Sequence, residues 1–346
     1  MSAEDMIETE EDLEDILSEP QPETVAVMSR LDGDLMILGC GGKMGPTLAN
    51  MMVRAAARAG VKKTVYGVSR FSNREIREKI EGWGIACIPC DLLRWDEVER
   101  LPRVRNVLYL AGRKFGKVGS DYLYWAMNCI APSHAARHFH DSRIVAFSTG
   151  NVYNLWPSQS DGPSEEDAFL SLGEYANSCL GRERIFEYYS RLNGTKMLLF
   201  RLNYAVELRY GVLYEIGKSL FEGKPIDLTT GYANVIWQGD ANNIAVRCLE
   251  HVASPPEILN VTGDKLRISE VARMFGERFS REPSFSGAEA PTALLSNSAK
   301  MKRLFGAPPT SLERMVEWIA EWIRRGGQSL DKPTHFQTRD GRYLDD

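Results

Sequence analysis

The segment GCGGKMG (39–45) has glycines at positions 39, 42 and 45, which is a GxxGxxG spacing. Glycine permits a tight turn and lets the backbone approach a pyrophosphate group closely. An apolar run, DLMILG (34–39), leads into this segment, and a helical pattern over 47–60 follows it. Because the first N–H groups of a helix bind phosphate, this context predicts a dinucleotide-binding loop. The residues that we expect to contact the cofactor here are Gly39, Gly42, Lys43, Met44 and Gly45.

Arginine rather than an acid follows the second apolar run, TVYGVS (64–69). Ser69 ends that run, Arg70 follows it, and Arg74 lies close behind. An acid here would accept hydrogen bonds from a ribose 2′-hydroxyl group, whereas an arginine fork matches the oxygens of a 2′-phosphate. We therefore expect NADP to be favoured over NAD. The alternative interpretation is that Arg70 is an ordinary solvated loop residue.

Apolar runs alternate with helical patterns from residue 34 onward, and this alternation would position the loop. The runs are nearly continuous in hydrophobicity, which is typical of a parallel sheet covered on both faces. Strands are expected over 34–39, 64–69, 84–90, 106–112, 143–148 and 196–202, with amphipathic helices over 47–60 and 174–192. The sequence therefore predicts an α/β fold built on a Rossmann-type doubly wound parallel sheet.

A smaller substrate-binding domain is expected after this alternation loosens near residue 205. The elements expected here would form the smaller domain or return to the sheet. They are helices over 212–222, 268–280 and 311–325, a turn-rich segment over 223–234 and a strand over 257–263. Open α/β sheets bind ligands at their carboxyl edge, where this domain would lie. The expected units are an NAD(P)-binding domain of residues 31–205 plus 234–263 and a smaller domain of residues 206–233 plus 264–346.

The first 30 residues are expected to form an acidic, disordered tail. Residues 1–24 hold ten of the 47 acidic residues and no basic residue, and like charges at this density oppose a compact state. The alternative is a helix that contacts a protein partner, since Met6, Leu13, Ile16 and Leu17 could share one face. The rest of the chain carries a net charge of +5, which favours an anionic small ligand and is too low for nucleic-acid binding.

Several segments together resemble the extended short-chain dehydrogenase/reductase family, the NAD(P)-dependent epimerase/dehydratase group. GCGGKMG resembles its cofactor loop, CDL (90–92) its motif near adenine, and LYLAG (108–112) its segment beside the nicotinamide. FSTGNVYN (147–154), EYANSCLGRERIFEYY (174–189), VIWQGDANNIA (235–245) and ILNVTG (258–263) are similar to later family segments, in the family's order. The resemblance covers residues 34–280. It implies further cofactor contacts from Asp91, Leu92, Ala111, Gly112 and Asn128.

The resemblance also implies hydride transfer with Thr149 and Tyr175 as the catalytic residues. In the family, a tyrosinate exchanges the proton of the substrate hydroxyl group. A lysine four residues after that tyrosine lowers its pKa and holds the nicotinamide ribose. This sequence has Cys179 at that cofactor-binding position. A cysteine is short, carries no charge as a thiol, and cannot replace either role of the lysine.

The missing lysine leaves three interpretations of the site. The first is a working oxidoreductase whose cation comes from Lys114 or Lys117, in the loop after the fourth predicted strand. The second is a degenerate site in a non-catalytic NAD(P)-binding regulator or sensor. The third is slow chemistry by Thr149 and Tyr175 alone. Arg182, two helical turns after Tyr175, is expected to lie too far away to help.

The substrate is expected to be a sugar, a sugar nucleotide or a similar polyol. Gly150 and Asn151 follow Thr149 where sugar-nucleotide 4,6-dehydratases have an Asp-Glu pair, so epimerisation or reduction is favoured over dehydration. FRLNYAVELRYG (200–211) resembles the family segment that contacts a substrate diphosphate. The expected substrate-binding residues are Lys114, Asn151, Asn203, Tyr204 and Arg209.

No metal site is expected, and His134, His138 and His140 are interpreted as solvent-facing histidines. Cys87 and Cys90 lie three apart on a predicted strand and so point to opposite faces, which disfavours a disulfide between them. Six scattered cysteines, no signal segment and no apolar run long enough to span a bilayer favour a cytoplasmic protein without a membrane partner. A homodimer is left open.

Overall fold

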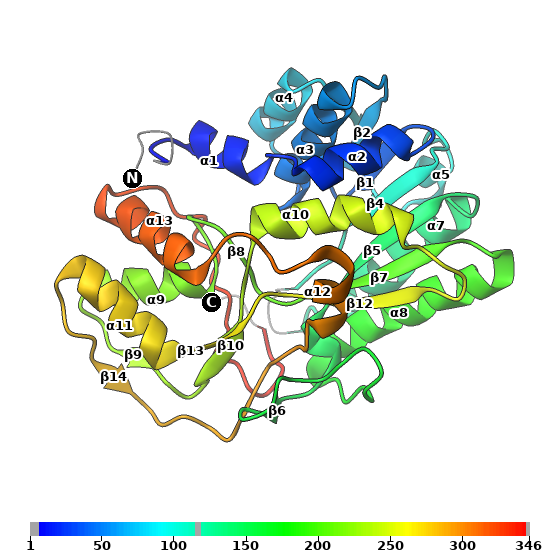
Figure 1. Cartoon of the computed structure of the whole chain (residues 1–346). Helices are drawn as coiled ribbons and strands as arrows, with labels where there is room; N and C mark the ends of the chain where they lie inside the picture. The colour runs from blue at the N-terminus through cyan, green and yellow to red at the C-terminus, as the bar shows by residue number, and fades with distance from the viewer. Residues whose placement is uncertain (1–6, 115–118, 344–346) are drawn as a thin grey trace.

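Seven parallel strands form the central sheet of the computed structural model, which describes residues 7–114 and 119–343. Their order is β12-β7-β5-β4-β1-β2-β3, so the first strand lies inside the sheet (Figure 1). All residues of β1 and β4 are buried, and burial on both faces explains why β1 is entirely apolar and β4 is apolar after Asn106. The predicted Rossmann-type sheet is confirmed. The strands are β1 (Leu35–Leu38), β2 (Val65–Ser69), β3 (Ala86–Pro89), β4 (Asn106–Tyr109), β5 (Arg143–Thr149), β7 (Met197–Leu202) and β12 (Glu257–Val261).

Helices cover both faces of this sheet, each burying an apolar stripe. One face packs against α2 (Pro22–Arg30), α3 (Gly45–Arg58), α4 (Arg74–Gly82), α10 (Gln238–Arg247) and α12 (Ala299–Phe305). The other face packs against α5 (Trp95–Val98), α7 (Ala131–His138) and the long helix α8 (Gly173–Asn193). A short helix, α6 (Tyr122–Trp125), and a π-helical turn, η2 (Ala126–Ile130), precede α7, and a 3₁₀ turn, η4 (Cys248–Glu250), follows α10.

A smaller group of helices packs beside the carboxyl edge of the sheet (Figure 1). It consists of α9 (Val212–Phe221), α11 (Ile268–Phe279) and α13 (Leu312–Arg324), whose apolar faces share one core. Met315, Ile319, Trp322 and Ile323 of α13 are buried there. Short strand pairs connect this group to the sheet. They are β11 (Ile236–Trp237) with β8 (Ala205–Val206), β10 (Tyr232–Asn234) with β13 (Lys265–Arg267), β14 (Phe285–Ser286) with β9 (Ile226–Asp227), and β15 (Thr292–Ala293) with β6 (Trp156–Pro157).

The prediction of a disordered N-terminal tail is wrong for the residues that the structure describes. Residues 10–17 form α1 (Glu10–Leu17), and α2 follows it. Thr9 caps α1 in a reciprocal capping box with Asp12, which fixes the start of the helix. Leu13 and Leu17 are fully buried in the core of the smaller domain, so the apolar face of α1 contacts this chain itself. Met6 lies outside the described residues.

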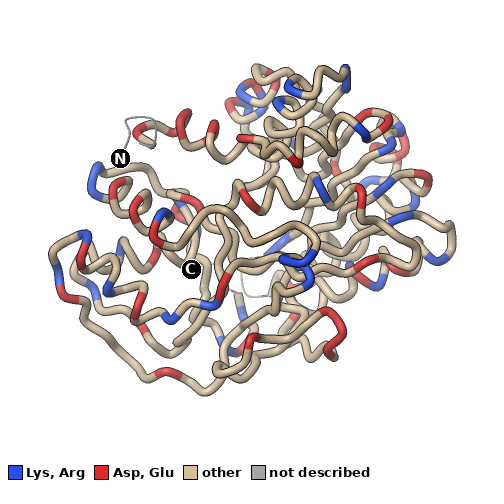
Figure 2. The backbone as a smooth tube through the Cα atoms, in the orientation of Figure 1, with Lys and Arg blue, Asp and Glu red and all other residues tan. Residues whose placement is uncertain are grey.

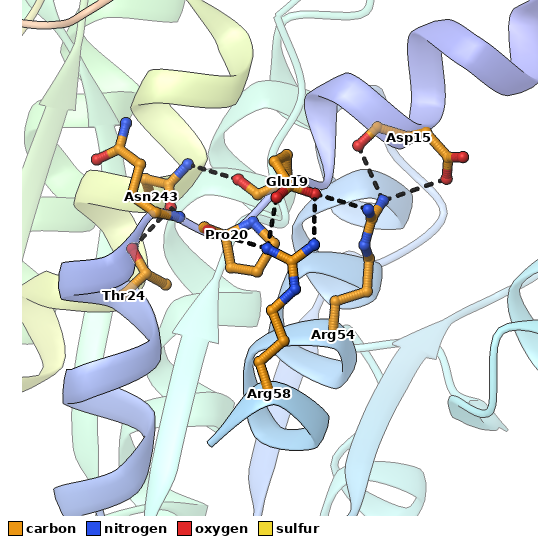
Figure 3. A network of polar contacts seen from close by, with 8 residues as sticks. Asp15, Glu19, Pro20, Thr24, Arg54, Arg58 and Asn243 are labelled. Atoms are coloured by element: carbon orange, nitrogen blue, oxygen red, sulfur yellow. Dashed lines mark hydrogen bonds and ion pairs between the residues drawn. The ribbon is translucent and has the colours of Figure 1, made fainter. Parts of the chain in front are cut away.

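Acidic residues lie along α1 and its flanks (Figure 2), and three of them, Glu14, Asp15 and Glu19, form ion pairs with basic residues of the body. Glu19 pairs with Arg54 at 2.6 Å and also with Arg58, both on α3, and Asp15 pairs with Arg54 at 3.2 Å (Figure 3). Asn243 of α10 donates a hydrogen bond to the backbone oxygen of Glu19 at 3.0 Å. Because these cations compensate the acidic charge, the repulsion expected from the sequence does not unfold the segment.

No helix among residues 7–114 and 119–343 is long and apolar enough to cross a membrane.

Candidate active site

A cavity of about 310 Å³ lies at the carboxyl edge of the sheet, between the sheet and the smaller domain. The loop from β1 to α3 forms one wall, and the ends of β5 and β7 with the start of α8 form another. The cavity therefore brings together two groups of residues that the sequence predicted separately. From these groups it is lined by Gly39, Gly42, Lys43, Met44, Gly45, Thr149, Asn151, Tyr175, Asn203 and Tyr204, and Lys114 lines it as well.

Two positions of the glycine loop require glycine for structural reasons, and a third faces open space. Gly39 has φ of +96°, and a Cβ atom there would lie 2.7 Å from the backbone nitrogen of Ala111 on the neighbouring strand end. A Cβ atom on Gly45 would overlap the backbone of Cys40, so the helix packs directly on the loop. Gly42 differs, because a Cβ atom there would meet only the oxygen of Gly39 at 3.3 Å. Gly42 thus leaves open space on the cavity side, where a phosphate could approach the backbone.

The other expected cofactor residues lie at the strand ends next to this loop. Ser69 is half-buried beside Gly41, and Arg70 is exposed at the end of β2. Asp91 accepts a hydrogen bond from the backbone N–H of Leu93 at 3.1 Å, and Leu92 is buried in the sheet core. The structure thus places these residues along the edge from β2 to β3, beside the cavity rather than in its lining.

Thr149 and Tyr175 face the same cavity from two elements. Thr149 ends β5, and its hydroxyl oxygen accepts hydrogen bonds from the backbone and side-chain nitrogens of Asn151, at 3.2 and 3.0 Å, in the turn η3 (Gly150–Val152). Tyr175 lies in the first turn of α8. Burial raises the pKa of Tyr175 well above its usual range, and Cys179 adds to this, while Arg182 and a hydrogen bond with Thr149 lower it. Tyr175 is therefore a protonated phenol beside a hydroxyl group.

Comparison with known proteins gives matches among solved structures alone. No family model and no curated protein sequence matches the chain. UDP-glucuronic acid 4-epimerase from Bacillus cereus in complex with NAD aligns with a TM-score of 0.69 and 17% identity, over 84% of this chain and 99% of that one. UDP-glucose 4-epimerase from Thermus thermophilus with NAD gives 0.66 and 18% over 84% and 99%, and the Bordetella bronchiseptica enzyme WbmH with NAD⁺ gives 0.67 and 20% over 84% and 98%. The chain shares the fold of these solved structures.

Cys179, which the sequence resemblance assigns to the family's lysine position, is fully buried one turn after Tyr175. Asn128, in the π-helical turn η2, places its amide nitrogen 3.8 Å from the Cys179 sulfur and 2.9 Å from the Ser178 hydroxyl oxygen. The amide oxygen of Asn128 accepts a hydrogen bond from the guanidinium group of Arg182. Arg182 therefore reaches the surroundings of Cys179 through Asn128, and its positive charge favours a lower pKa for both Tyr175 and Cys179.

Two lysines bring positive charge to the cavity. Lys43 of the glycine loop lies 3.2 Å from the centre of the Tyr210 ring, and burial lowers its pKa to about 7. Lys114 donates a hydrogen bond to the backbone oxygen of Thr334 at 3.0 Å, and burial lowers its pKa to about 8. Glu215 of α9 is the nearby acid that favours the charged form of both lysines. Lys117 lies outside the described residues.

The C-terminal segment forms a wall that sequence reasoning missed. Tyr343 donates a hydrogen bond to Asn151 at 2.5 Å, and its backbone oxygen accepts one from the Tyr124 hydroxyl at 3.1 Å. Further back, Thr334 donates from its backbone nitrogen and hydroxyl to Glu215, at 2.5 and 2.9 Å. The segment has no helical or strand pattern, so no signal in the sequence assigns it to the site.

The expected substrate residues divide into two groups. Asn203 is buried, with its amide nitrogen 3.4 Å from the Ser296 hydroxyl oxygen, and Tyr204 has φ of +44°; both line the cavity. Arg209 does not line it. Its guanidinium group pairs with Glu207 at 3.2 Å and with Glu10 of α1 at 3.0 Å, so its charge holds α1 in place.

The described residues contain no group of three side chains suited to hold a metal ion. The interpretation of all three histidines as solvent-facing is wrong for two of them. His134 and His138 each place a ring nitrogen 2.9 Å from a backbone oxygen, those of Leu92 and Leu101, and His138 is buried. Both histidines therefore support α7 against the loops that follow β3.

Proposed function

We propose that the chain is an NAD(P)-dependent oxidoreductase or epimerase that acts by hydride transfer on a sugar, a sugar nucleotide or a similar polyol. The observation that carries the proposal is that one cavity joins the glycine loop to Thr149 and Tyr175. One end of the cavity could hold the phosphates of the cofactor, and the other end has the Thr149 hydroxyl and the Tyr175 phenol. This arrangement suits hydride exchange between a nicotinamide cofactor and a carbinol. The same fold in NAD-bound 4-epimerases of UDP-sugars supports this substrate class.

The glycine loop fits a dinucleotide. Gly42 leaves open space toward the cavity, and α3 begins directly after the loop at Gly45, so the free N–H groups of the helix start are available to a phosphate. When bound, the nicotinamide ring would accept or donate the hydride. NADP is preferred over NAD in this proposal, because Ser69 and the exposed Arg70 end β2 where an acid would bind the ribose.

Tyr175 exchanges the substrate proton. In oxidation, Tyr175 first loses its own proton to solvent. The carbinol proton then passes to the tyrosinate oxygen, while the carbinol C–H bond gives up its electron pair with the hydride. In reduction, Tyr175 donates its proton to the carbonyl oxygen. Burial favours the protonated phenol, so reduction needs no prior ionisation of Tyr175. Thr149 orients the substrate oxygen by donating its own hydroxyl hydrogen.

Lys114, Asn151, Asn203 and Tyr204 are the proposed substrate contacts, because all four line the cavity. Arg209 is left out, since its guanidinium group is held by two acids outside that lining. Lys43 and Lys114 are both half-buried, and their charged forms make this end of the cavity positive, which suits an anionic substrate or cofactor group.

Turnover on a panel of sugars and sugar nucleotides, with NADP and NAD in both oxidation states, tests the proposal. Oxidoreduction is followed by the absorbance of the reduced nicotinamide and epimerisation by separation of the products. We expect turnover of at least one member. The second candidate function is a non-catalytic NAD(P)-binding regulator. Two observations favour it: a cysteine stands at position 179, and the ring of Tyr343 packs against the ring of Tyr175. Nucleotide binding without any turnover would select the regulator.

A cytoplasmic location and a homodimer also belong to this proposal. All six cysteines are free thiols, which supports a reducing compartment. A protein partner for the acidic N-terminal segment is less favoured, because α1 packs on this chain and its acids pair with basic residues of the body.

A further inference from the structure

Arg182 is a buried cation without a carboxylate partner. Arg182 is only 7% exposed. Its guanidinium group donates to the backbone oxygen of Phe147 at 2.8 Å and to the amide oxygen of Asn128, which are both neutral acceptors. Among residues 7–114 and 119–343, no acid forms an ion pair with it, and its Nε atom has no hydrogen-bond partner. Burying an uncompensated charge is costly, so such a residue is retained for a reason.

The neighbouring buried arginine shows how this chain compensates a purely structural cation. Arg201 of β7 is fully buried and binds Glu183 through two parallel hydrogen bonds, at 2.7 and 2.9 Å. It also donates to the Tyr153 hydroxyl at 2.6 Å. Glu183 directly follows Arg182 in α8, yet its carboxylate is committed to Arg201. The positive charge of Arg182 is thus left for another group to balance.

The space around Arg182 is shaped for its guanidinium group. A Cβ atom at Gly112, in the segment after β4, would overlap the Arg182 Nη2 atom, so a side chain there would displace the guanidinium group from its present position. Tyr175, Cys179 and Arg182 recur at helical spacing and share one face of α8. Long helical side chains point back toward the N-terminus, so Arg182 extends toward Cys179. The short cysteine leaves room there that a lysine would fill.

We propose that Arg182 is a positioning residue that supplies, from seven positions after Tyr175, the positive charge that the family takes from a lysine four positions after the tyrosine. This inference rests on the proposed function. A chain of polar contacts connects Arg182 to Tyr175. Arg182 donates to the amide oxygen of Asn128, the amide nitrogen of Asn128 contacts the Cys179 sulfur, and Cys179 contacts the Tyr175 hydroxyl. The electrostatic effect agrees, because Arg182 lowers the pKa of Tyr175 against burial. The charge that balances Arg182 is the tyrosinate formed when Tyr175 gives up its proton.

Other ionisable groups also surround Tyr175, and Lys114 is the alternative source of charge. Those packed around it are Cys179 and Arg182 of α8, Tyr124 of α6, Tyr343 of the C-terminal segment and Lys114 after β4. Burial lowers the pKa of Lys114 to about 8, so it loses its charge in mildly basic solution. An arginine stays protonated throughout, which makes Arg182 the permanent cation of the site.

The test is a titration of Tyr175 itself, which needs no turnover. The full chain carries 3,5-difluorotyrosine at position 175, whose fluorine NMR shift reports ionisation at a pH where the protein stays folded. Arg182→Gln keeps an amide donor for Phe147 and removes the charge, so we expect the midpoint to rise by one pH unit or more, a tenfold change in proton affinity. Arg182→Lys should move it less. Arg184→Gln, an exposed residue of the same helix, is the control and should leave it unchanged.

Rescue and replacement variants complete the test. Cys179→Lys combined with Arg182→Gln should restore the midpoint, whereas Lys114→Met should shift it less than Arg182→Gln does. If Arg182→Gln does not fold, Cys179→Lys alone decides. If Cys179→Lys changes the titration midpoint of Tyr175 only slightly, Arg182 already supplies the charge. If it lowers the midpoint by one pH unit, a tenfold change in proton affinity, no cation acted on Tyr175 before. Equal midpoints for Arg182→Gln and Arg184→Gln would overturn the inference even in an active enzyme. Loss of the proposed function would instead appear as absent turnover with the titration unchanged.

Discussion

The ring of Tyr343 packs edge-on against the ring of Tyr175, with 5.4 Å between the ring centroids and 78° between the planes. Tyr343 is the last residue that the structure describes, whereas Tyr175 lies in the first turn of α8. The contact brings the C-terminal segment onto the proposed proton donor. It contributes to the burial that keeps Tyr175 protonated. From the same segment, Thr334 lines the cavity.

Removing this ring should change Tyr175 and the stability of the chain together. Tyr343→Ala lets water reach Tyr175, and since burial is the largest cause of its raised pKa, that pKa should fall. Losing a buried aromatic side chain should also lower the free energy of unfolding by about 3 kcal/mol. Fluorine NMR titration and denaturant unfolding measure the two effects. Tyr188→Ala, where the residue is 60% exposed, is the control and should change neither. An unchanged pKa of Tyr175 would show that the contact does not control its solvation.

The glycine loop gives a prediction about nucleotide binding. Gly42→Val places a branched side chain in the open space beside the cavity, so it should abolish NADP binding while the fold survives. Calorimetric titration measures binding, and circular dichroism checks the fold. Gly82→Ala is the matched control, because a Cβ atom at that position meets nothing within 4 Å. A folded Gly42→Val protein that binds NADP normally would reduce the loop to an ordinary turn.

Cofactor preference depends on Arg70 in this account. We expect NADP to bind about tenfold more tightly than NAD, a difference of about 1.4 kcal/mol. Arg70→Ala should remove that difference by weakening NADP binding alone, because NAD has no 2′-phosphate. Calorimetry with both nucleotides tests this, with Arg77→Ala as the control on an exposed face of α4. Equal affinities in the native protein would withdraw the assignment of Arg70.

The sheet and the glycine loop were predictable from the sequence, because local periodicity specifies them. Predicted strands such as 106–112 and 257–263 correspond to β4 and β12, and the predicted helix over 47–60 corresponds to α3. At the N-terminus the favoured prediction was disorder, and a helix with Leu13 and Leu17 on one face was only the alternative, because the acid count outweighed that apolar face. Their stability depends on basic residues far along the chain, such as Arg54 and Arg209, which no local pattern identifies.

The site was predictable only in part, for a similar reason. Thr149 and Tyr175 meet at the cavity as the family segments imply. The spacing along α8 suggested that Arg182 is too distant from Tyr175. Such an argument considers only the backbone turns between two residues and ignores the reach and direction of a long side chain. Tyr343 belongs to a segment without periodicity, so only the folded chain shows its contact with Tyr175.

Nucleotide affinity should depend on pH through Lys43. Burial lowers the pKa of this lysine to about 7, so it is mostly charged at pH 6 and mostly neutral at pH 8. An anionic nucleotide is attracted to the charged form, and its affinity should therefore fall as pH rises through about 7. Calorimetry at several pH values measures this, and Lys43→Met should bind more weakly with little pH dependence between 6 and 8. A slope that persists in Lys43→Met would assign the effect to another group.

Tyr175→Phe tests the proposed chemistry most directly. The substitution removes the hydroxyl group that exchanges the proton and changes the shape of the side chain little. Turnover should fall by about a hundredfold or more, because general acid–base catalysis contributes on that scale. NADP affinity should change little, since the glycine loop binds the nucleotide. Tyr153→Phe is the matched control, a buried tyrosine whose hydroxyl hydrogen bonds to Arg201 and Asn260 outside the cavity lining. It should lower stability and spare turnover at temperatures where it stays folded. If both variants kept full turnover, the proton would have to come from another donor, and the two lysines that line the cavity, Lys43 and Lys114, have pKa values of about 7 and about 8 that suit that role.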